Sequence, residues 1–382
     1  MKNRVNRLSA SIAVLCLALM VSLAGSLSAR GEDVGVSWDP GKAASYLDSR
    51  AVWWSEWSGA ARDHGTYCIS CHTTLPYALA RPRLRALLHE ARPSAAEGRI
   101  MDNLLTRVKL GRDSEPFYPD QTRGIPKTSE SRAIEAVMNA LVLARRDADV
   151  GTLTEVTKSS LEAMWALQMK VGPNAGAWTW LNFNYEPWES PNSPYLGASL
   201  AALAVGAAPG HYAESPEIRG NLSALRQYFQ KQFPNESTLN RLMALWASGG
   251  VKDLLTTEQR TMAVNEAFAK QQADGGWATA FLGTYSRVDK TPLDSNTDGY
   301  ATGLATLALQ AAGVSTGDPR LERGLAWLRS HQNPDTGQWS ASSLNKHRDP
   351  NSDPAKFMSD AATAYAVLSL TFSESRSSLP SR

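Results

Sequence analysis

The residues of this 382-residue chain best suited to chemistry are Cys68-Ile69-Ser70-Cys71-His72. Two thiols two residues apart, followed directly by an imidazole, have the spacing typical of covalent haem attachment. In that chemistry the thiols add across the two vinyl groups of haem, and the imidazole binds the iron as the proximal ligand. The sequence therefore predicts one covalent haem c on Cys68 and Cys71, with His72 as the iron ligand.

Three other interpretations of the two cysteines stay open. They could match the haem spacing by chance and form a tight disulfide. A thioredoxin-like redox pair is disfavoured because no βαβ pattern surrounds the motif. A zinc site is disfavoured because no second Cys/His pair stands at a suitable spacing. The third cysteine, Cys16, lies in the predicted export signal.

The main candidates for the second axial ligand of the iron are His347 and Met358. Both lie in the last long loop, which a closed ring of helices would bring beside the first hairpin. His64 stays open as a further possibility, although it is close to the motif in sequence. Alternatively, the iron is five-coordinate and leaves a position for a small ligand such as oxygen or nitric oxide. Arg81 and Arg83 follow the motif by one helical stretch and are candidates to pair with the haem propionates.

The N-terminus is predicted to be an export signal over residues 1–29. Lys2, Arg4 and Arg7 precede an apolar run from Ala10 to Ala24, and small residues follow. This pattern is typical of a cleaved secretory signal, with an uncleaved membrane anchor as the alternative. Removing residues 1–28 takes away three positive charges and changes the formal net charge from +2 to −1. No concentrated basic face remains, so we expect no nucleic-acid partner.

The elements that must position the motif are predicted to be twelve helices in six hairpins. First helices are expected near 41–57, 95–109, 154–170, 216–231, 257–272 and 318–331, and second helices near 74–91, 129–147, 192–207, 236–248, 298–313 and 359–372. The second helices at 192–207, 298–313 and 359–372 are apolar nearly all round and should therefore be buried on most sides. We expect a single domain over 30–373, followed by a flexible tail at 374–382.

The loop lengths predict which face of this array is functional. The loops from first to second helix are mostly long, at 58–73, 110–128, 171–191, 273–297 and 332–358, whereas the return loops are short. In an alternating array the long loops emerge on one face, which usually carries the function. The haem-attachment loop at 58–73 belongs to this face. The 171–191 loop is rich in aromatic residues, which could shield a haem, bind an apolar molecule or cap the array.

Three segments repeat a pattern of a glutamine followed by a Gly-x-Trp or Gly-Trp sequence. The pairs are Gln168/Trp178, Gln272/Trp277 and Gln332/Trp339. They resemble the QW motifs of the squalene–hopene cyclase and prenyltransferase superfamily, most clearly over residues 155–372. The resemblance implies an all-α (α/α)6 toroid whose inner helices line a central cavity. It also implies that these Gln and Trp residues are structural and tie loops to helix ends.

The catalytic signature of the cyclases does not carry over. Their Asp-x-Asp-Asp-Thr-Ala motif protonates an alkene, but the nearest match, residues 359–364, reads Ser-Asp-Ala-Ala-Thr-Ala. A second candidate, residues 298–303, keeps only its first acid, Asp298, which is expected to cap the following helix. The sequence therefore favours the family's scaffold without its reaction.

Together these features predict an exported monohaem c-type protein on a terpenoid-cyclase-like toroid, periplasmic or extracellular, in electron transfer or small-ligand redox chemistry. The alternative is a diverged squalene cyclase or prenyltransferase-like enzyme, or an isoprenoid-binding protein, without the Asp-rich motif. The expected partners are a periplasmic redox protein, an apolar small molecule in the central cavity, and peripheral contact with a membrane.

Overall fold

A computed structural model of the protein describes residues 38–372. The predicted signal at 1–29 and the predicted tail at 374–382 lie outside the described residues. Within the described range the regular elements are helices, and all twelve predicted helices are present. The first helices of the hairpins are α2 (Pro40–Glu56), α4 (Ala95–Leu110), α7 (Glu155–Ala166), α9 (Arg219–Gln232), α11 (Thr257–Ala269) and α13 (Pro319–Ser330). The second helices are α3 (Thr74–Leu87), α6 (Lys127–Val150), α8 (Ser193–Ala207), α10 (Thr238–Ala247), α12 (Gly299–Ala311) and α14 (Phe357–Leu370).

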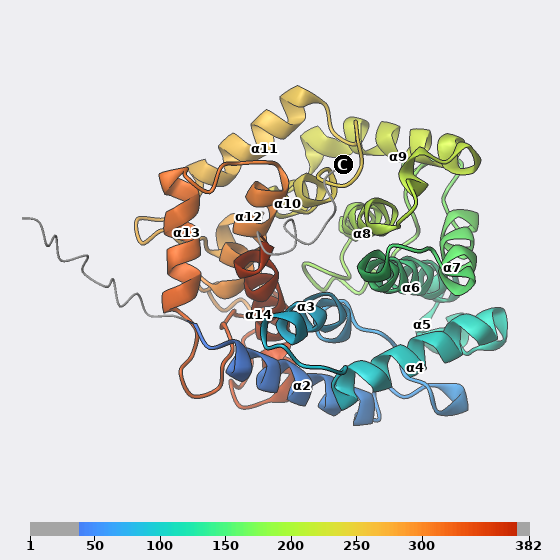
Figure 1. Ribbon diagram of the computed structural model, residues 1–382, viewed down its shortest axis with the longest axis horizontal. Coiled ribbons are helices and arrows are strands. Elements are labelled where there is room, and N and C mark those ends of the chain that lie inside the picture. Colours follow the sequence, from blue (N-terminus) through green and yellow to red (C-terminus); the bar gives the residue numbers. More distant parts are fainter. Residues whose placement is uncertain (1–37, 373–382) are drawn as a thin grey trace, which may run out of the picture. The chain divides into compact units, whose positions relative to one another are not determined.

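The second helices form a closed inner ring. Each packs against the next, in the order α3, α6, α8, α10, α12 and α14, and α14 packs back against α3. The first helices lie outside this ring, as Figure 1 shows in a view down its axis. The short helix α5 (Asp120–Arg123) is the one addition to the expected set. The predicted all-α (α/α)6 toroid is therefore confirmed.

Composition explains which helices lie inside. Every residue of α12 is buried, and so are most residues of α8 and α14, because these segments carry Ala, Leu and small polar residues on every side. The outer helix α9 instead buries a stripe of Leu222, Leu225, Tyr228 and Phe229 and exposes its charged side. An all-round apolar helix needs neighbours on every side, whereas an amphipathic helix needs a core on one side only.

The repeated tryptophans tie each loop to the end of the outer helix before it. Each indole Nε1–H donates to a carbonyl oxygen in the last turns of that helix. The bonds are Trp178 to Met164 at 2.7 Å, Trp277 to Ala267 at 2.6 Å and Trp339 to Leu328 at 2.8 Å. The C-terminal carbonyls of a helix lack partners within the helix, so these bonds satisfy them. The structural role that the resemblance implied is confirmed.

The glutamines reach the next outer helix, and the structure corrects one assignment. Gln168 donates to the carbonyls of Gly176 and Asn221. In the second repeat the equivalent bonds, to Gly275 and Arg320, come from Gln271. Gln272 donates to Lys270 instead, so the pairing of Gln272 with Trp277 is wrong by one residue. Two consecutive glutamines made the register ambiguous in the sequence.

The third repeat closes the ring onto the first helix. Gln332 donates to the carbonyls of Gly337 and Asp39, and its own side-chain oxygen accepts the Asp39 N–H at 2.6 Å. Gly337 has φ +79°, and a Cβ there would lie 2.4 Å from the backbone of Lys42. Only glycine meets both conditions, because positive φ and a close backbone approach each exclude a side chain.

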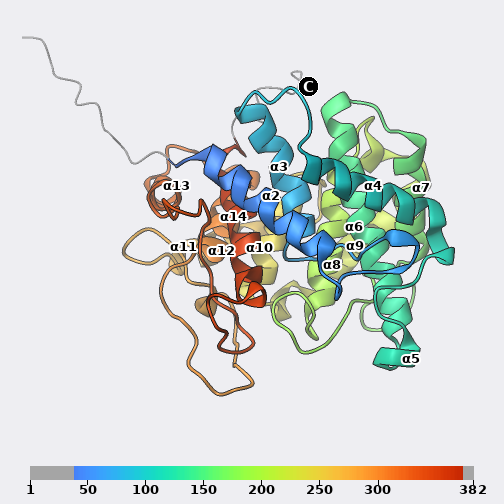
Figure 2. The same ribbon diagram turned by 90° about the horizontal axis from the view of Figure 1, so that it is seen from below.

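The long loops emerge at one end of the ring, as predicted. In Figure 2 the loops between α11 and α12 and between α13 and α14 extend beyond the helices at the same end, together with α5. The inner helices all begin at this end, which we call the loop end. Asp298 caps α12 by accepting the N–H of Ala301, which confirms its expected role. No helix in the range 38–372 is long and apolar enough to cross a membrane.

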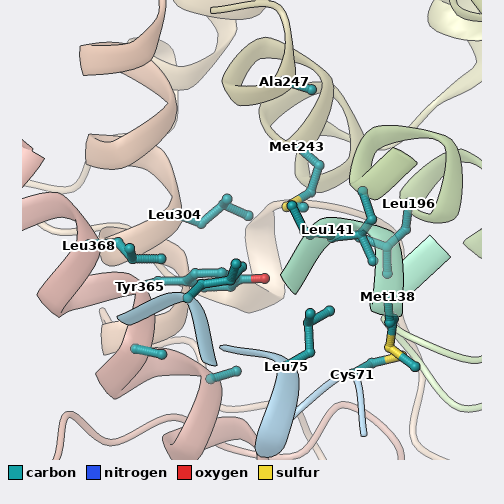
Figure 3. Close-up of a cluster of buried hydrophobic side chains, with 14 of the residues drawn as sticks. Cys71, Leu75, Met138, Leu141, Leu196, Met243, Ala247, Leu304, Tyr365 and Leu368 are labelled. Carbon is teal, nitrogen blue, oxygen red and sulfur yellow. The ribbon is translucent and has the colours of Figure 1, made fainter. Parts of the chain in front are cut away.

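The middle of the ring is filled by side chains. Figure 3 shows Leu75, Met138, Leu141, Met243, Leu304, Tyr365 and Leu368 on the inner helices, together with Cys71 of the motif loop, pointing toward one another. All are less than 10% exposed. The toroid is therefore not an open channel, because this plug separates a cavity at the loop end from another at the opposite end.

Candidate functional site

The cysteine–histidine motif lines a cavity at the loop end, here called the loop-end cavity. Its volume is about 240 Å³. Its walls come from the end of α2, the motif loop, the loop between α4 and α6, the aromatic loop before α8, the last long loop and the start of α14. The lining includes Cys68, Cys71, His72, Trp54, Trp57, Phe117, Tyr118, Tyr185, Trp188, Glu189, Arg348, Phe357 and Met358. Four loops distant in sequence thus meet around the predicted haem site.

Local hydrogen bonds hold the motif loop between α2 and α3. The indole N–H of Trp54 on α2 donates to the carbonyl of Cys68 at 2.7 Å. The hydroxyl of Ser70 accepts the N–H groups of Thr73 and Thr74 at 3.2 and 3.0 Å, which starts α3 directly after the motif. A serine in this position satisfies N–H groups that the first turn of a helix leaves without partners. Ser70, which lies between the two cysteines, therefore helps to fix the conformation of the motif loop.

Both cysteines are buried free thiols. Cys68 is 5% and Cys71 7% exposed, and the Cys71 Sγ lies 3.9 Å from the Sδ of Met138. Desolvation by burial raises the pKa of Cys68 to about 11 and that of Cys71 well above its usual value. Reactive and zinc-binding cysteines need thiolates stabilised by positive charge or metal. No group of three metal-ligating side chains converges in residues 38–372.

The His72 imidazole is packed between aromatic rings, with part of its surface open to the cavity. It stacks on Phe357 with ring centroids 3.9 Å apart, and its centroid lies 5.0 Å from that of Trp54 and 5.4 Å from that of Trp188. Burial, with smaller contributions from Arg50 and Arg348, lowers the pKa of His72 to about 3. The imidazole is therefore neutral at pH 7, the form that binds metals.

A hydrogen-bonded chain determines which nitrogen of His72 carries the proton. Its Nδ1 lies 2.8 Å from the Thr73 hydroxyl, and that hydroxyl donates to Asp360 Oδ2 at 2.7 Å. Because the threonine's only proton goes to the carboxylate, its oxygen must accept from Nδ1–H. The lone pair is thus left on Nε2. A partner on the second nitrogen fixes the tautomer and orientation of metal-binding histidines in general.

Asp360 is fully buried and is held by three donors. Its Oδ1 accepts from the Tyr46 hydroxyl and the Arg50 Nε, both at 2.8 Å, and its Oδ2 accepts from Thr73. Burial raises its pKa, whereas the Arg50 guanidinium and the three hydrogen bonds act in the opposite direction. Asp360 is therefore an anchor that links α14 to α2 and to the motif, and its oxygens are not free to act as an acid on a substrate.

The structure treats the two candidate sixth ligands differently. Met358, at the start of α14, is 3% exposed and lines the same cavity as His72. His347 is exposed, does not line the cavity, and its backbone N–H donates to Asp289. Of the two predicted residues, only Met358 is brought to the motif.

The arginines predicted to face the haem site do not lie there. Arg81 is buried in ion pairs with Asp48 at 3.0 Å and Glu90 at 2.7 Å. Arg83 lines the cavity at the opposite end of the ring. The prediction for both residues is wrong because α3 runs away from the motif along the axis. Arg348, in the last long loop, is the arginine that lines the loop-end cavity.

The aromatic loop contributes unevenly to the cavity. Tyr185 and Trp188 line it, whereas Trp178 and Trp180 are buried within the fold. Glu189 also lines the cavity, and burial raises its pKa to about 7, with Lys127 acting weakly in the opposite direction. Sequence reasoning missed Glu189, although its position directly after Trp188 was a usable signal.

The residues of the loop-end cavity fit a covalently attached haem. Two free thiols and a neutral imidazole with an unbonded Nε2 line one space, with an apolar aromatic wall and one arginine. The enclosed volume of about 240 Å³ is smaller than a porphyrin requires, and the space continues outward through an open mouth. Trp57 and Tyr185, which are 38% and 51% exposed, flank this mouth.

Comparisons with known proteins find one family model that matches part of the chain. No curated protein matches the chain. Among solved structures, a variant of UGL with dGlcA-Glc-Rha-Glc is 14% identical, covering 86% of this chain and 95% of its own, with a TM-score of 0.46. A polysaccharide lyase is 13% identical, covering 91% and 92%, with a TM-score of 0.37. The family model of the squalene–hopene cyclase C-terminal domain matches residues 237–358, so the chain is similar there to the terpenoid-cyclase toroids that its repeats resemble.

Proposed function

We propose that this protein is an exported monohaem c-type protein that transfers electrons. Cys68 and Cys71 would hold the haem covalently, and His72 Nε2 would bind the iron. The observation that carries the proposal is the His72–Thr73–Asp360 chain at the loop-end cavity, which leaves Nε2 as the free nitrogen. The basic and apolar N-terminal run supports export to the compartment where such attachment takes place.

The residues around the cavity have separate tasks in this proposal. The bound group would supply one-electron iron chemistry. Asp360 and Thr73 orient the imidazole and keep its proton on Nδ1. Phe357 and Trp188 exclude water from the ring. Met358 lines the cavity as the candidate for the sixth ligand.

A line of aromatic rings favours electron transfer over the sensing of a small ligand. The ring centroids of His72 and Trp54 are 5.0 Å apart, and those of Trp54 and Trp57 are 5.3 Å apart. Trp57 is 38% exposed, so the line runs from the motif to the surface. A redox partner that docks over Trp57 would therefore reach the site through two rings.

The alternative function, a diverged cyclase, is not supported by the surroundings of its two candidate acids. Asp298 is used by the N–H groups of Ala301 and Thr279 and by the Thr279 hydroxyl. Asp360 is used by the three donors described above. Protonating an alkene requires an acid that reaches the substrate, whereas both carboxylates are occupied by hydrogen bonds within the fold.

The decisive experiment is a reduced pyridine haemochrome spectrum. The protein is expressed with its own N-terminus in a host that has a cytochrome c maturation system, then denatured and extracted with acid–acetone. We expect about one haem per chain to stay attached, and none in Cys68→Ala/Cys71→Ala. Absence of covalent haem from the wild-type chain would overturn the proposal.

A second variant tests the hydrogen-bonded chain separately from attachment. Thr73→Val keeps both thiols but removes the partner of the His72 Nδ1–H. We expect covalent haem at wild-type levels and a higher reduction potential, because the imidazole becomes a less basic ligand without its acceptor. Leu75→Val, at a buried position on the same helix, should leave the potential unchanged.

A further inference from the structure

The cavity at the opposite end of the ring has no part in the haem proposal. All six inner helices or the turns directly after them line it, and its volume is about 240 Å³. Its walls are largely apolar and include Leu79, Leu141, Leu203, Trp246, Ala247, Leu307, Ala311 and Leu368. Two charged side chains, Arg83 on α3 and Arg145 on α6, also line it, and we call it the arginine cavity.

The two arginines reach this cavity because of helical spacing. On α6, Ile134 lines the loop-end cavity, Met138 and Leu141 belong to the central plug, and Arg145 lines the arginine cavity. Steps of three and four residues keep these side chains on one face of the helix. The face that points to the axis therefore ends in a guanidinium group, which is an unusual side chain for the interior of a ring of apolar helices.

Neither guanidinium group has a partner. Within residues 38–372, no hydrogen bond or ion pair involves Arg83 or Arg145, in contrast to Arg50, Arg81 and Arg107. Arg145 is enclosed by protein almost completely, yet part of its side chain is accessible because it faces the cavity. Burial, followed by the positive charge of Arg83, lowers the pKa of Arg145 to about 10.

Two unpaired and mutually repelling charges in a partly enclosed, largely apolar space are unfavourable, and an anion between them would offset that cost. Asp149 is the acid with an electrostatic influence on both, and it is exposed. The positive charges would suit the negative ends of the inner helices, but neither arginine bonds to a carbonyl there. An anion with two guanidinium neighbours can accept several charge-assisted hydrogen bonds at once.

We propose that the arginine cavity binds an amphipathic anion: a carboxylate or phosphate head on a short aliphatic chain. Arg83 and Arg145 would hold the head, and the leucines and Trp246 would surround the chain. About 240 Å³ corresponds to roughly eight water-sized groups at ~30 Å³ each, which fits a chain of about eight carbons. The site lies on the far side of the central plug, so this inference does not depend on haem.

The test is isothermal titration calorimetry of the full-length protein with four matched probes. Octanoate and octyl phosphate carry the proposed heads, whereas 1-octanol and octylamine carry the same chain with a neutral or positive head. We expect one or both anions to bind with 1:1 stoichiometry, and the alcohol and amine to bind at least tenfold more weakly. The tighter anion identifies the head group. Equal affinity for octanol and the anions would overturn the proposal.

Two variants and one control separate recognition from folding. Arg83→Met and Arg145→Met should each weaken anion binding at least tenfold, whereas Arg219→Met, at an exposed position on α9, should not. In the absence of ligand, Arg145→Met should raise the thermal midpoint, because it removes an unpaired buried charge. If Arg145→Met binds the anion as well as wild type does, or lowers the midpoint, the arginine supports the fold and the proposal is wrong.

Discussion

The arginines that line the arginine cavity differ from the buried arginines of the loop end. At the loop end Arg50 pairs with Asp360 at 2.8 Å, Arg287 donates to the carbonyls of Ser343 and Pro292, and Arg107 donates to Glu135 on α6. Ten residues further along the same helix, Arg145 has no partner. Burying a charge is tolerable when hydrogen bonds and an opposite charge compensate it. The arginines of the loop end are therefore compensated within the chain, whereas Arg83 and Arg145 would be compensated by the proposed anion.

The largest effect on stability is expected from removing the acid of the buried Arg50–Asp360 pair. Asp360→Ala leaves the Arg50 guanidinium buried and removes the acceptor of Tyr46 and Thr73. Removing one partner of a buried pair typically costs about 3–5 kcal/mol of unfolding free energy, measurable by urea denaturation. Asp353→Ala is the control, because Asp353 pairs with the same arginine but is 39% exposed. It should cost about 0–1 kcal/mol; equal losses would refute the comparison.

Removing an unpaired arginine of the arginine cavity should change the unfolding free energy in the opposite direction. Arg145→Met removes a charge whose burial is uncompensated, so we expect the unfolding free energy at pH 7 to rise by about 1–3 kcal/mol. Arg107→Met on the paired side should instead lower it, because Glu135 would be left buried alone. Both changes replace a buried arginine with methionine, so lost packing affects them alike. A loss of stability in both variants would mean that the two ends do not differ.

Glu189, an acid at the loop end, makes the stability of the protein depend on pH. Burial raises the pKa of Glu189 to about 7 from an ordinary 4.5. The folded protein therefore keeps this proton where the unfolded chain has lost it, and stability falls as the pH rises from 4.5 to 7. Glu189→Gln should match wild type at pH 4 and exceed it by about 1–2 kcal/mol at pH 8. Urea titrations at both pH values check this, and a constant difference between them would contradict it.

The fold was accessible from the sequence because three of the six hairpins repeat one pattern. The all-round apolar second helices and the Gln…Gly-x-Trp segments predicted twelve helices and the toroid. The motif loop and its neighbours in space were partly accessible, since a closed ring brings the last long loop to the first, and Met358 does line the cavity. His347 lies in the same loop yet stays exposed, because loop conformation decides such contacts and leaves little periodicity to read.

The charge pairing was not accessible from the sequence. Arg50 and Asp360 are 310 positions apart and meet through ring closure alone. Arg81 and Arg83 are two positions apart on α3, yet one is paired at the helix surface and the other lines the arginine cavity. A difference of two residues turns a side chain by about half a helical circumference. The positions of the two arginines could therefore be predicted only by knowing which face of α3 points to the axis.

The smallest effects on stability are expected from two substitutions near opposite ends of α14. Met358 lines the loop-end cavity and Leu368 the arginine cavity, both on α14. Met358→Leu and Leu368→Met nearly conserve volume and should each change the unfolding free energy by less than about 1.5 kcal/mol. In the haem-loaded protein, Met358→Leu should change the visible spectrum and lower the reduction potential, because a thioether ligand raises it. Leu368→Met should change neither, since Leu368 lies on the side of the central plug that faces the arginine cavity. An unchanged spectrum in Met358→Leu would remove Met358 as the sixth ligand while leaving the attachment at Cys68 and Cys71 untouched.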